Sequence, residues 1–143
     1  MNLHPLLCSA MTEVKVWIHW NGNYGACCDD LLGCIATAAT LEGIKKEFAE
    51  ALEFHLEGMR EDGDVIPDVF DRKYELKFEL TDLALIHYAG EMVNRSALSK
   101  FTGISKTLLD HYFIGNSVPR PQQVERIKNG MRAIAAQLSA LCL

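Results

Sequence analysis

The chain has 143 residues, a hydrophobic fraction of 49% and a net charge of −5, values that allow one domain or two small ones and exclude disorder throughout the chain. The total hides an asymmetry, because residues 1–80 carry 7 Lys/Arg and 15 Asp/Glu, a net charge of −8, whereas residues 81–143 carry 7 and 4, a net charge of +3. The contrast predicts an acidic module suited to a basic partner and a mildly basic module able to approach phosphate, although a solvated acidic surface is the simpler interpretation of the first half.

The five cysteines indicate a reducing compartment rather than disulfides or zinc. Their number is odd, no pair has C-x-x-C spacing, and the five histidines are scattered, so neither a structural metal nor a cofactor is expected. No apolar run approaches the roughly 18 to 20 residues of a membrane span, and the N-terminus lacks a signal-peptide pattern. We therefore expect a soluble, cytoplasmic protein that does not contact a membrane.

The first regular pattern predicts a small sheet. Apolar and polar side chains alternate from Val14 to Trp20, which is typical of a half-buried strand. Asn21-Gly22 supplies positive-φ backbone at little cost, so the chain is predicted to turn there into a hairpin. Two further strands are predicted over residues 24–28 and 33–37, joined by a turn that contains Asp29 and Asp30.

An amphipathic helix is predicted after the third strand. Thr40 suits the N-cap position, and apolar residues then recur on one helical stripe with charged residues opposite. We expect the helix to lie on the sheet and to end at Gly58 or just beyond, because Asp62-Gly63 cannot extend it cheaply. Alternation over residues 73–80 predicts one more strand, so residues 13–80 have the order β-β-β-α-β.

Trp17 and His19 are candidates for contact with another protein. If the Val14/Ile18 side of the strand packs on the helix, these two side chains point the other way, and exposed aromatic residues on a sheet are typical contact anchors. A second, smaller core that covers them is the alternative. Tyr24, on the returning strand, is grouped with them as a candidate.

Asp29, Asp30 and the helix carboxylates have the chemistry of a metal-dependent nuclease site, since phosphodiester hydrolysis often uses paired acids around magnesium. Asp is nevertheless common in turns for local hydrogen bonding, and the helix acids form the solvent face. His19 has no Ser, Cys or acid placed by the sequence to partner it. No catalytic residue and no metal site are therefore expected, and the protein is not predicted to be an enzyme.

Residues 81–143 are predicted to form four or five helices around a compact core. Helical spacing starts after Thr81 and is interrupted at Asn94 to Ser96, where Asn or Ser can cap the next helix. Pro121 suits the first turn of a final helix. The apolar stripe of that helix consists of Val124, Ile127, Met131, Ile134, Leu138 and Leu141.

The stretch LSKFTGISKTLLDHY, residues 98–112, has the features of a helix-turn-helix. Such a motif needs a small residue in its first helix, a glycine at the turn, and a second helix whose outward side chains reach base edges. Ser99 and Gly103 meet the first two needs. Two ordinary bundle helices joined at a glycine are the alternative, but the Gly-Asn…Pro-Arg-Pro segment and the apolar closing helix that follow are more than this alternative predicts.

With these elements in order, the sequence resembles the HicB family of antitoxins, in the form that carries a Cro/repressor-like helix-turn-helix behind the N-terminal domain. The resemblance covers about residues 13–141 and rests on VKVWIHWNGNYGACCDDLLGC and TLEGIKKEFAEALEFHLEGMREDGDVIP in the first module and LSKFTGISKTLLDHYFIGNSVPRP in the second. It implies an α+β fold, with a partial ribonuclease-H-like, non-catalytic domain over 13–80 and an all-α helix-turn-helix domain over 81–143.

The resemblance also implies a function. The first domain of the family binds and blocks a small, basic HicA-type toxin that cleaves messenger RNA, and the second binds the operator of its own operon. Repressors of this kind usually act as dimers, so a homodimer or higher homo-oligomer is expected, with operator half-sites about 34 Å apart. A transcription regulator with a ligand-sensing N-terminal domain and a ribonuclease-H-like nuclease are the alternatives.

On this hypothesis the candidate site residues fall into two groups. The DNA-binding residues are Ser105, Lys106, Thr107 and His111, which face the major groove, and Asn116 and Arg120, which contact phosphates. The toxin-binding residues are Trp17, His19, Tyr24, Asp29 and Asp30. Asp110, also on the second helix of the motif, is expected to repel phosphate or to accept a hydrogen bond from a cytosine amino group.

Overall fold

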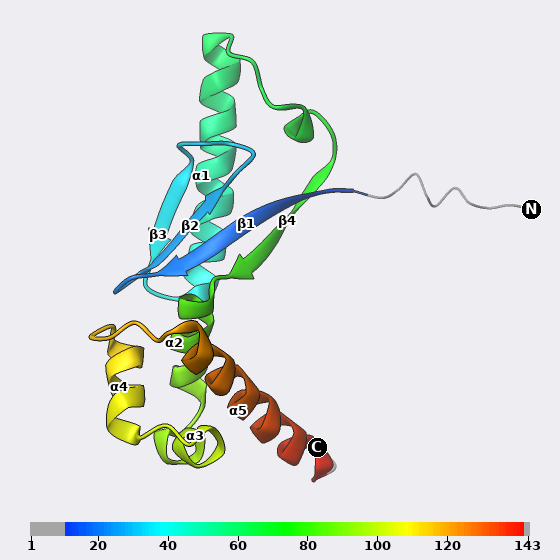
Figure 1. The fold of residues 1–143 in the computed structure, drawn as a ribbon. Coiled ribbons are helices and arrows are strands. Elements are labelled where there is room, and N and C mark those ends of the chain that lie inside the picture. The colour runs from blue at the N-terminus through cyan, green and yellow to red at the C-terminus, as the bar shows by residue number, and fades with distance from the viewer. Residues whose placement is uncertain (1–10, 142–143) are drawn as a thin grey trace, which may run out of the picture. The chain divides into compact units, whose positions relative to one another are not determined.

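A computed structural model describes residues 11–141 and divides the chain into two compact units (Figure 1). Among the described residues, the first unit comprises residues 11–19 together with Asn23–Glu79, and the second comprises Trp20–Gly22 and residues 80–141. The described chain has α+β architecture, as predicted, with one four-stranded sheet and five α-helices. Within residues 11–141, no helix combines the length and the apolar character needed to cross a membrane.

The first unit has the predicted order β-β-β-α-β, and its strands form a mixed sheet in the order β3-β2-β1-β4. β2 and β3 are antiparallel. β1 and β4 run parallel. The carboxylate of Glu13 lies 3.7 Å from the Lys77 ammonium, and two residues further along both strands the Lys15 ammonium lies 3.7 Å from the Glu79 carboxylate. The elements are β1 (Thr12–Trp20), β2 (Tyr24–Cys28), β3 (Ile35–Ala38), α1 (Leu41–Asp62), a 3-10 turn (Asp68–Phe70) and β4 (Tyr74–Leu80).

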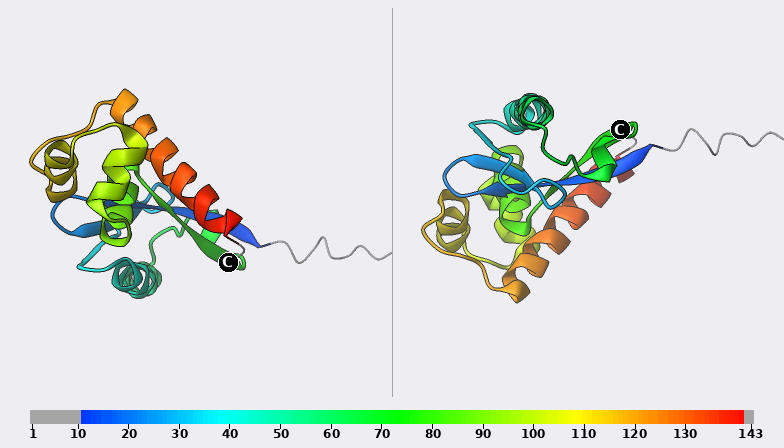
Figure 2. Two further views of the ribbon diagram at one scale, coloured as in Figure 1. Left: turned by 90° about the horizontal axis from the view of Figure 1, so that it is seen from below. Right: turned by 90° about the horizontal axis from the view of Figure 1, so that it is seen from above.

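α1 packs along one face of this sheet, as the end-on views in Figure 2 show. Its apolar stripe is buried there, including Phe48 with no exposed surface, and burial of such a side chain contributes about 1.5–3 kcal/mol to stability. Tyr74 of β4 donates a hydrogen bond of 2.7 Å to the Glu53 carboxylate of α1. Burial and this bond raise the pKa of Tyr74 to about 12.

α1 passes Gly58, the earliest end predicted for it, and stops at the Asp62-Gly63 step that was predicted to end it. The helix continues to Asp62 and ends at Gly63, whose left-handed φ of 76° lets its N–H reach the carbonyl of Arg60. A glycine inside a helix costs only about 1 kcal/mol relative to alanine, which the burial of the preceding turns outweighs. The positive φ, rather than the presence of glycine, therefore decides where the helix stops.

The second unit contains four helices, within the predicted four or five, and it has the predicted cap at Asn94 and the predicted Pro121 start; the caps at Thr81 and Ser105 were not predicted. Thr81, Asn94 and Ser105 each accept a backbone N–H at the start of a helix, and Pro121 occupies the first turn of the last one. The helices are α2 (Asp82–Met92), α3 (Arg95–Thr102), α4 (Lys106–Ile114) and α5 (Pro121–Ala140). Their shared core consists of Ile86, Leu98, Ile104, Leu109, Phe113, Val124 and Ile127.

α3 and α5 approach each other closely at Gly130. A Cβ atom added there would overlap the Cγ2 methyl of Thr102, a buried side chain, and would lie 3.6 Å from the backbone carbon of Phe101. The absence of a side chain at this position therefore sets the separation of the two helices.

Gly130→Ala is expected to lower the free energy of unfolding by about 1–3 kcal/mol, because the added methyl overpacks the α3–α5 contact. Urea denaturation of the variant and the wild-type protein measures the difference. Gly58→Ala in α1 is the matched control, since nothing lies within 4 Å of its added Cβ, and it should raise stability by about 0.5–1 kcal/mol. A Gly130→Ala protein as stable as the wild type would contradict the close packing.

Candidate nucleic-acid interface

Side-chain hydrogen bonds hold the turn between α3 and α4. Gly103 adopts a left-handed φ of 74°. The Thr102 hydroxyl donates to the carbonyl of Leu98 at 2.7 Å and accepts from the N–H of Ile104 at 3.1 Å. The Ser99 hydroxyl donates to the carbonyl of Ile104 at 2.6 Å. Ser99, a residue larger than alanine at a crowded position, thus contributes a hydrogen bond across the turn.

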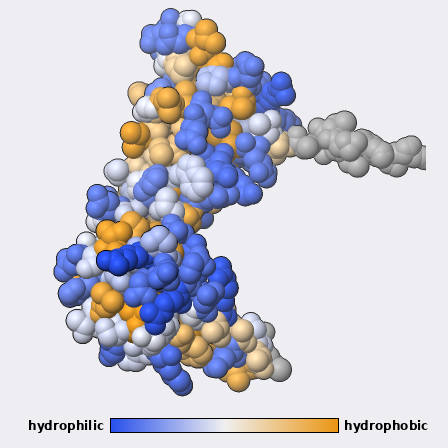
Figure 3. Space-filling view, in the orientation of Figure 1, coloured by the Kyte–Doolittle hydropathy of each residue, from blue (hydrophilic) through white to orange (hydrophobic). Residues whose placement is uncertain are grey.

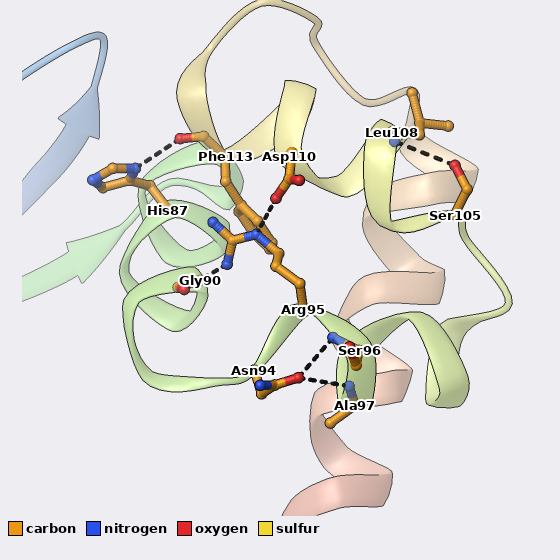
Figure 4. Close-up of polar contacts among 10 residues, drawn as sticks. All are labelled: His87, Gly90, Asn94, Arg95, Ser96, Ala97, Ser105, Leu108, Asp110 and Phe113. Atoms are coloured by element: carbon orange, nitrogen blue, oxygen red, sulfur yellow. Dashed lines mark hydrogen bonds and ion pairs between the residues drawn. The ribbon is translucent and has the colours of Figure 1, made fainter.

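α4 has one buried face and one exposed face. Leu109 and Phe113 lie in the core of the unit. Ser105, predicted to face the major groove, caps the helix: its hydroxyl oxygen accepts a hydrogen bond from the N–H of Leu108 at 3.2 Å (Figure 4). The side chains on the outer face, all exposed, are Lys106, Thr107, Asp110, His111 and Ile114. Asn116 and Arg120, predicted to contact phosphate, are exposed as well, beyond the end of α4.

Asp110 is held by an arginine that the sequence did not single out. Arg95, the first residue of α3, donates from Nε to the Asp110 carboxylate at 2.7 Å and from Nη1 to the carbonyl of Gly90 at 2.7 Å (Figure 4). Its guanidinium carbon also lies 3.9 Å from the centroid of the Phe113 ring. The ion pair offsets the negative charge on α4 and therefore weakens the repulsion of phosphate that Asp110 alone would cause.

A polar hollow of about 500 Å³ lies between α4 and the start of α5. Arg120 and Arg126 both line it, together with Tyr112 and Gln123. Arg126 donates to the carbonyl of Thr102 and to the Gln123 side chain, each at 2.9 Å, so its guanidinium is held in place. Arg126 was not predicted as a site residue. It lies in the last helix, five residues after Pro121, and only this place near the start of the helix could have suggested it.

Trp17 and His19 lie together on the sheet face opposite α1, as the alternation predicts. Trp17 is half-buried beneath Lys15, whose ammonium lies 5.1 Å from the ring centroid. His19 is exposed, and its Nε2 lies 3.5 Å from the sulfur of Cys27 on β2. This exposed face forms the candidate protein-contact surface of the first unit.

The grouping of Tyr24 with these residues is wrong. Tyr24 lies on the α1 face and is only 1% exposed, so a partner at the Trp17 surface cannot touch it. The alternation of β2 starts with a buried position, and one residue of register decides which face a strand side chain occupies.

Asp29 and Asp30 are exposed in the segment between β2 and β3, as the turn interpretation predicts. In the described part of the chain, no three His, Cys, Asp or Glu side chains are grouped so that they could hold a metal ion. Cys28 and Cys34 nearby are buried, and burial raises the pKa of both thiols.

No protein-family model matches the sequence, and no curated protein matches it either.

Arg95→Ala is expected to destabilise the second unit by about 1–2 kcal/mol, because it leaves the Gly90 carbonyl and the Phe113 ring uncovered. Asp110→Asn should cost less than about 1 kcal/mol, because the ion pair is partly exposed. Urea denaturation of both variants checks the order. Equal losses would mean that the ion pair, rather than the contacts with Gly90 and Phe113, accounts for the effect of Arg95.

Proposed function

We propose that this chain is a HicB-type antitoxin and autorepressor. The second unit binds operator DNA through the outer face of α4, and the first unit binds and neutralises a small, basic HicA-type toxin that cleaves messenger RNA. Both targets are cytoplasmic, so the protein acts there. The order β-β-β-α-β, with α1 on one face of the sheet, is compatible with the partial ribonuclease-H-like domain that the resemblance implies.

The observation that carries the DNA-binding half is the exposed polar face of α4 behind a glycine turn. Lys106, Thr107 and His111 are exposed on a helix whose other face is locked into the core, and donors of these types can bind base edges in the major groove. Arg120 and Arg126 lie beside that face and suit phosphates, which position a protein on the duplex without reading its sequence.

The toxin-binding half is supported by charge and by the bare face of the sheet. A net charge of −8 over residues 1–80 attracts a basic partner and raises its association rate. The half-buried Trp17 and the exposed His19 offer the kind of aromatic anchor that is enriched at protein interfaces. Asp29 and Asp30, exposed after β2, add negative charge to the same unit.

Operator binding is proposed to involve two copies of the chain. Apolar side chains gather at the C-terminal end of α5, the lower right of Figure 3. Leu138 is 49% and Leu141 70% exposed there, beside a groove that Phe101 and Ile134 also line. Residues 133–141 contain no charged side chain, so two copies of this part of α5 can meet without burying one. A two-fold pairing of this kind would present two α4 helices to successive turns of the duplex.

Lys106→Ala combined with Arg120→Ala is expected to weaken binding to a duplex taken from upstream of the gene by at least about tenfold and to reduce the slope of log affinity against log salt by about 1 to 2. Fluorescence anisotropy at several salt concentrations measures both quantities. The matched control, Lys46→Ala with Arg72→Ala, removes the same charge from exposed positions of the first unit and should bind DNA normally. Loss of toxin capture in the first variant would argue against separate binding units.

Trp17→Ala is expected to weaken capture of the toxin encoded beside this gene by about tenfold or more, since a central tryptophan often dominates an interface. Co-purification and calorimetry with the co-expressed basic protein measure the effect, and rescue of growth reports neutralisation. Phe54→Ala, which removes an aromatic ring 80% exposed on α1, is the control and should leave capture unchanged. A larger loss with Phe54→Ala would move the toxin surface to the helix face.

A further inference from the structure

Trp20 is the last residue of β1, yet it belongs to the second compact unit together with Asn21 and Gly22. Its ring is stacked on the imidazole of His87 in α2, with centroids 3.9 Å apart and an interplanar angle of 15°. Stacking of the indole on the imidazole covers apolar ring surface on both residues and is a favourable aromatic contact. The turn of the first hairpin thus supplies a side chain to the helical unit.

The contacts of Trp20 converge on the C-terminal end of α4. His87 donates from Nδ1 to the carbonyl of Phe113 at 3.1 Å, a bond drawn in Figure 4. Gly115, which ends α4 with a φ of 86°, lies directly against the indole, because a Cβ there would be 3.3 Å from ring atom Cζ3 of Trp20. Trp20 therefore touches two of the residues that hold the last turn of α4.

The last turn of α4 needs such support. The final four carbonyls of a helix have no partner within it, and the Phe113 carbonyl is one of these. α4 has only nine residues, and a helix of that length is marginal without tertiary contacts. His111 and Ile114, exposed on this same turn, are the side chains whose direction depends on how firmly it is held.

We propose that Trp20 is a positioning residue for DNA reading: it fixes the C-terminal turn of α4 through His87 and Gly115 without touching DNA. The effect on DNA binding rests on the proposed function, whereas the support that Trp20 gives to the last turn of α4 does not. Trp20 lies outside the buried core cluster and is only half-buried, so its removal should loosen one helix end rather than unfold the unit.

The test compares Trp20 with an exposed aromatic residue of the first unit in the full-length protein. Trp20→Ala is expected to weaken binding to the upstream duplex by about 3- to 10-fold, and Trp20→Phe, which can still stack, should restore most of it. Phe54→Ala, which removes a ring that is 80% exposed on α1, is the control and should bind DNA as the wild type does. Hydrogen exchange should show faster exchange of the amides from Tyr112 to Asn116 in Trp20→Ala, with the amides around Ile127 still protected.

The outcomes separate this inference from the proposed function. Wild-type protein that binds no duplex removes the DNA-binding proposal, and unchanged exchange at the end of α4 in Trp20→Ala removes the positioning role. Normal DNA binding by Trp20→Ala also overturns it. If Trp20→Ala loses protection throughout the unit, Trp20→Leu, which is apolar but cannot stack, is compared with Trp20→Phe, and equal DNA binding by the two overturns the proposal.

Discussion

The placement of α4 depends on the packing of the Phe113 ring between α2 and an arginine. A Cβ at Gly90 would lie 2.7 Å from this ring, so α2 and α4 can approach only because position 90 has no side chain. Arg95 lies over the same ring and donates to the Gly90 carbonyl and to Asp110. Phe113, in the last turn of α4, therefore links this helix to the end of α2 and, through Arg95, to the start of α3. This contact therefore decides which side of α4 faces outward.

Charge in the second unit is arranged so that acids are engaged within the unit. Asp110 pairs with Arg95 at 2.7 Å and Asp82 pairs with Lys128 at 2.5 Å, so two of the four acidic residues after residue 80 pair with Arg or Lys, and a third, Glu91, lies 3.4 Å from Nε2 of His87. Lys106, by contrast, is exposed on α4. The surface beside α4 is thereby more favourable to phosphate than the modest net charge of +3 suggests, because local pairing rather than the total decides the nearby field.

The two units are not successive along the chain. A division into residues 13–80 and 81–143 follows from composition, and the observed boundary between Glu79 and Leu80 lies one residue away. The three residues Trp20–Gly22 nevertheless belong to the helical unit. Alternation assigned Trp20 to the buried side of a strand, whereas its ring stacks on His87, 67 positions later in the sequence. Local pattern cannot reveal a partner at that separation.

The sequence by itself determined the order of the elements, the cap at Asn94, the Pro121 helix start and the glycine turn of the second unit, because N-cap side chains, glycine at positive φ and apolar periodicity act over a few residues. It also determined that Trp17 and His19 share a face. The tertiary structure alone decided that Tyr24 is buried, that α1 passes Gly58, and that Arg95 neutralises Asp110. Each of these depends on strand register, on a distant packing surface or on a contact between residues far apart in the chain, and such long-range terms outweigh local preference.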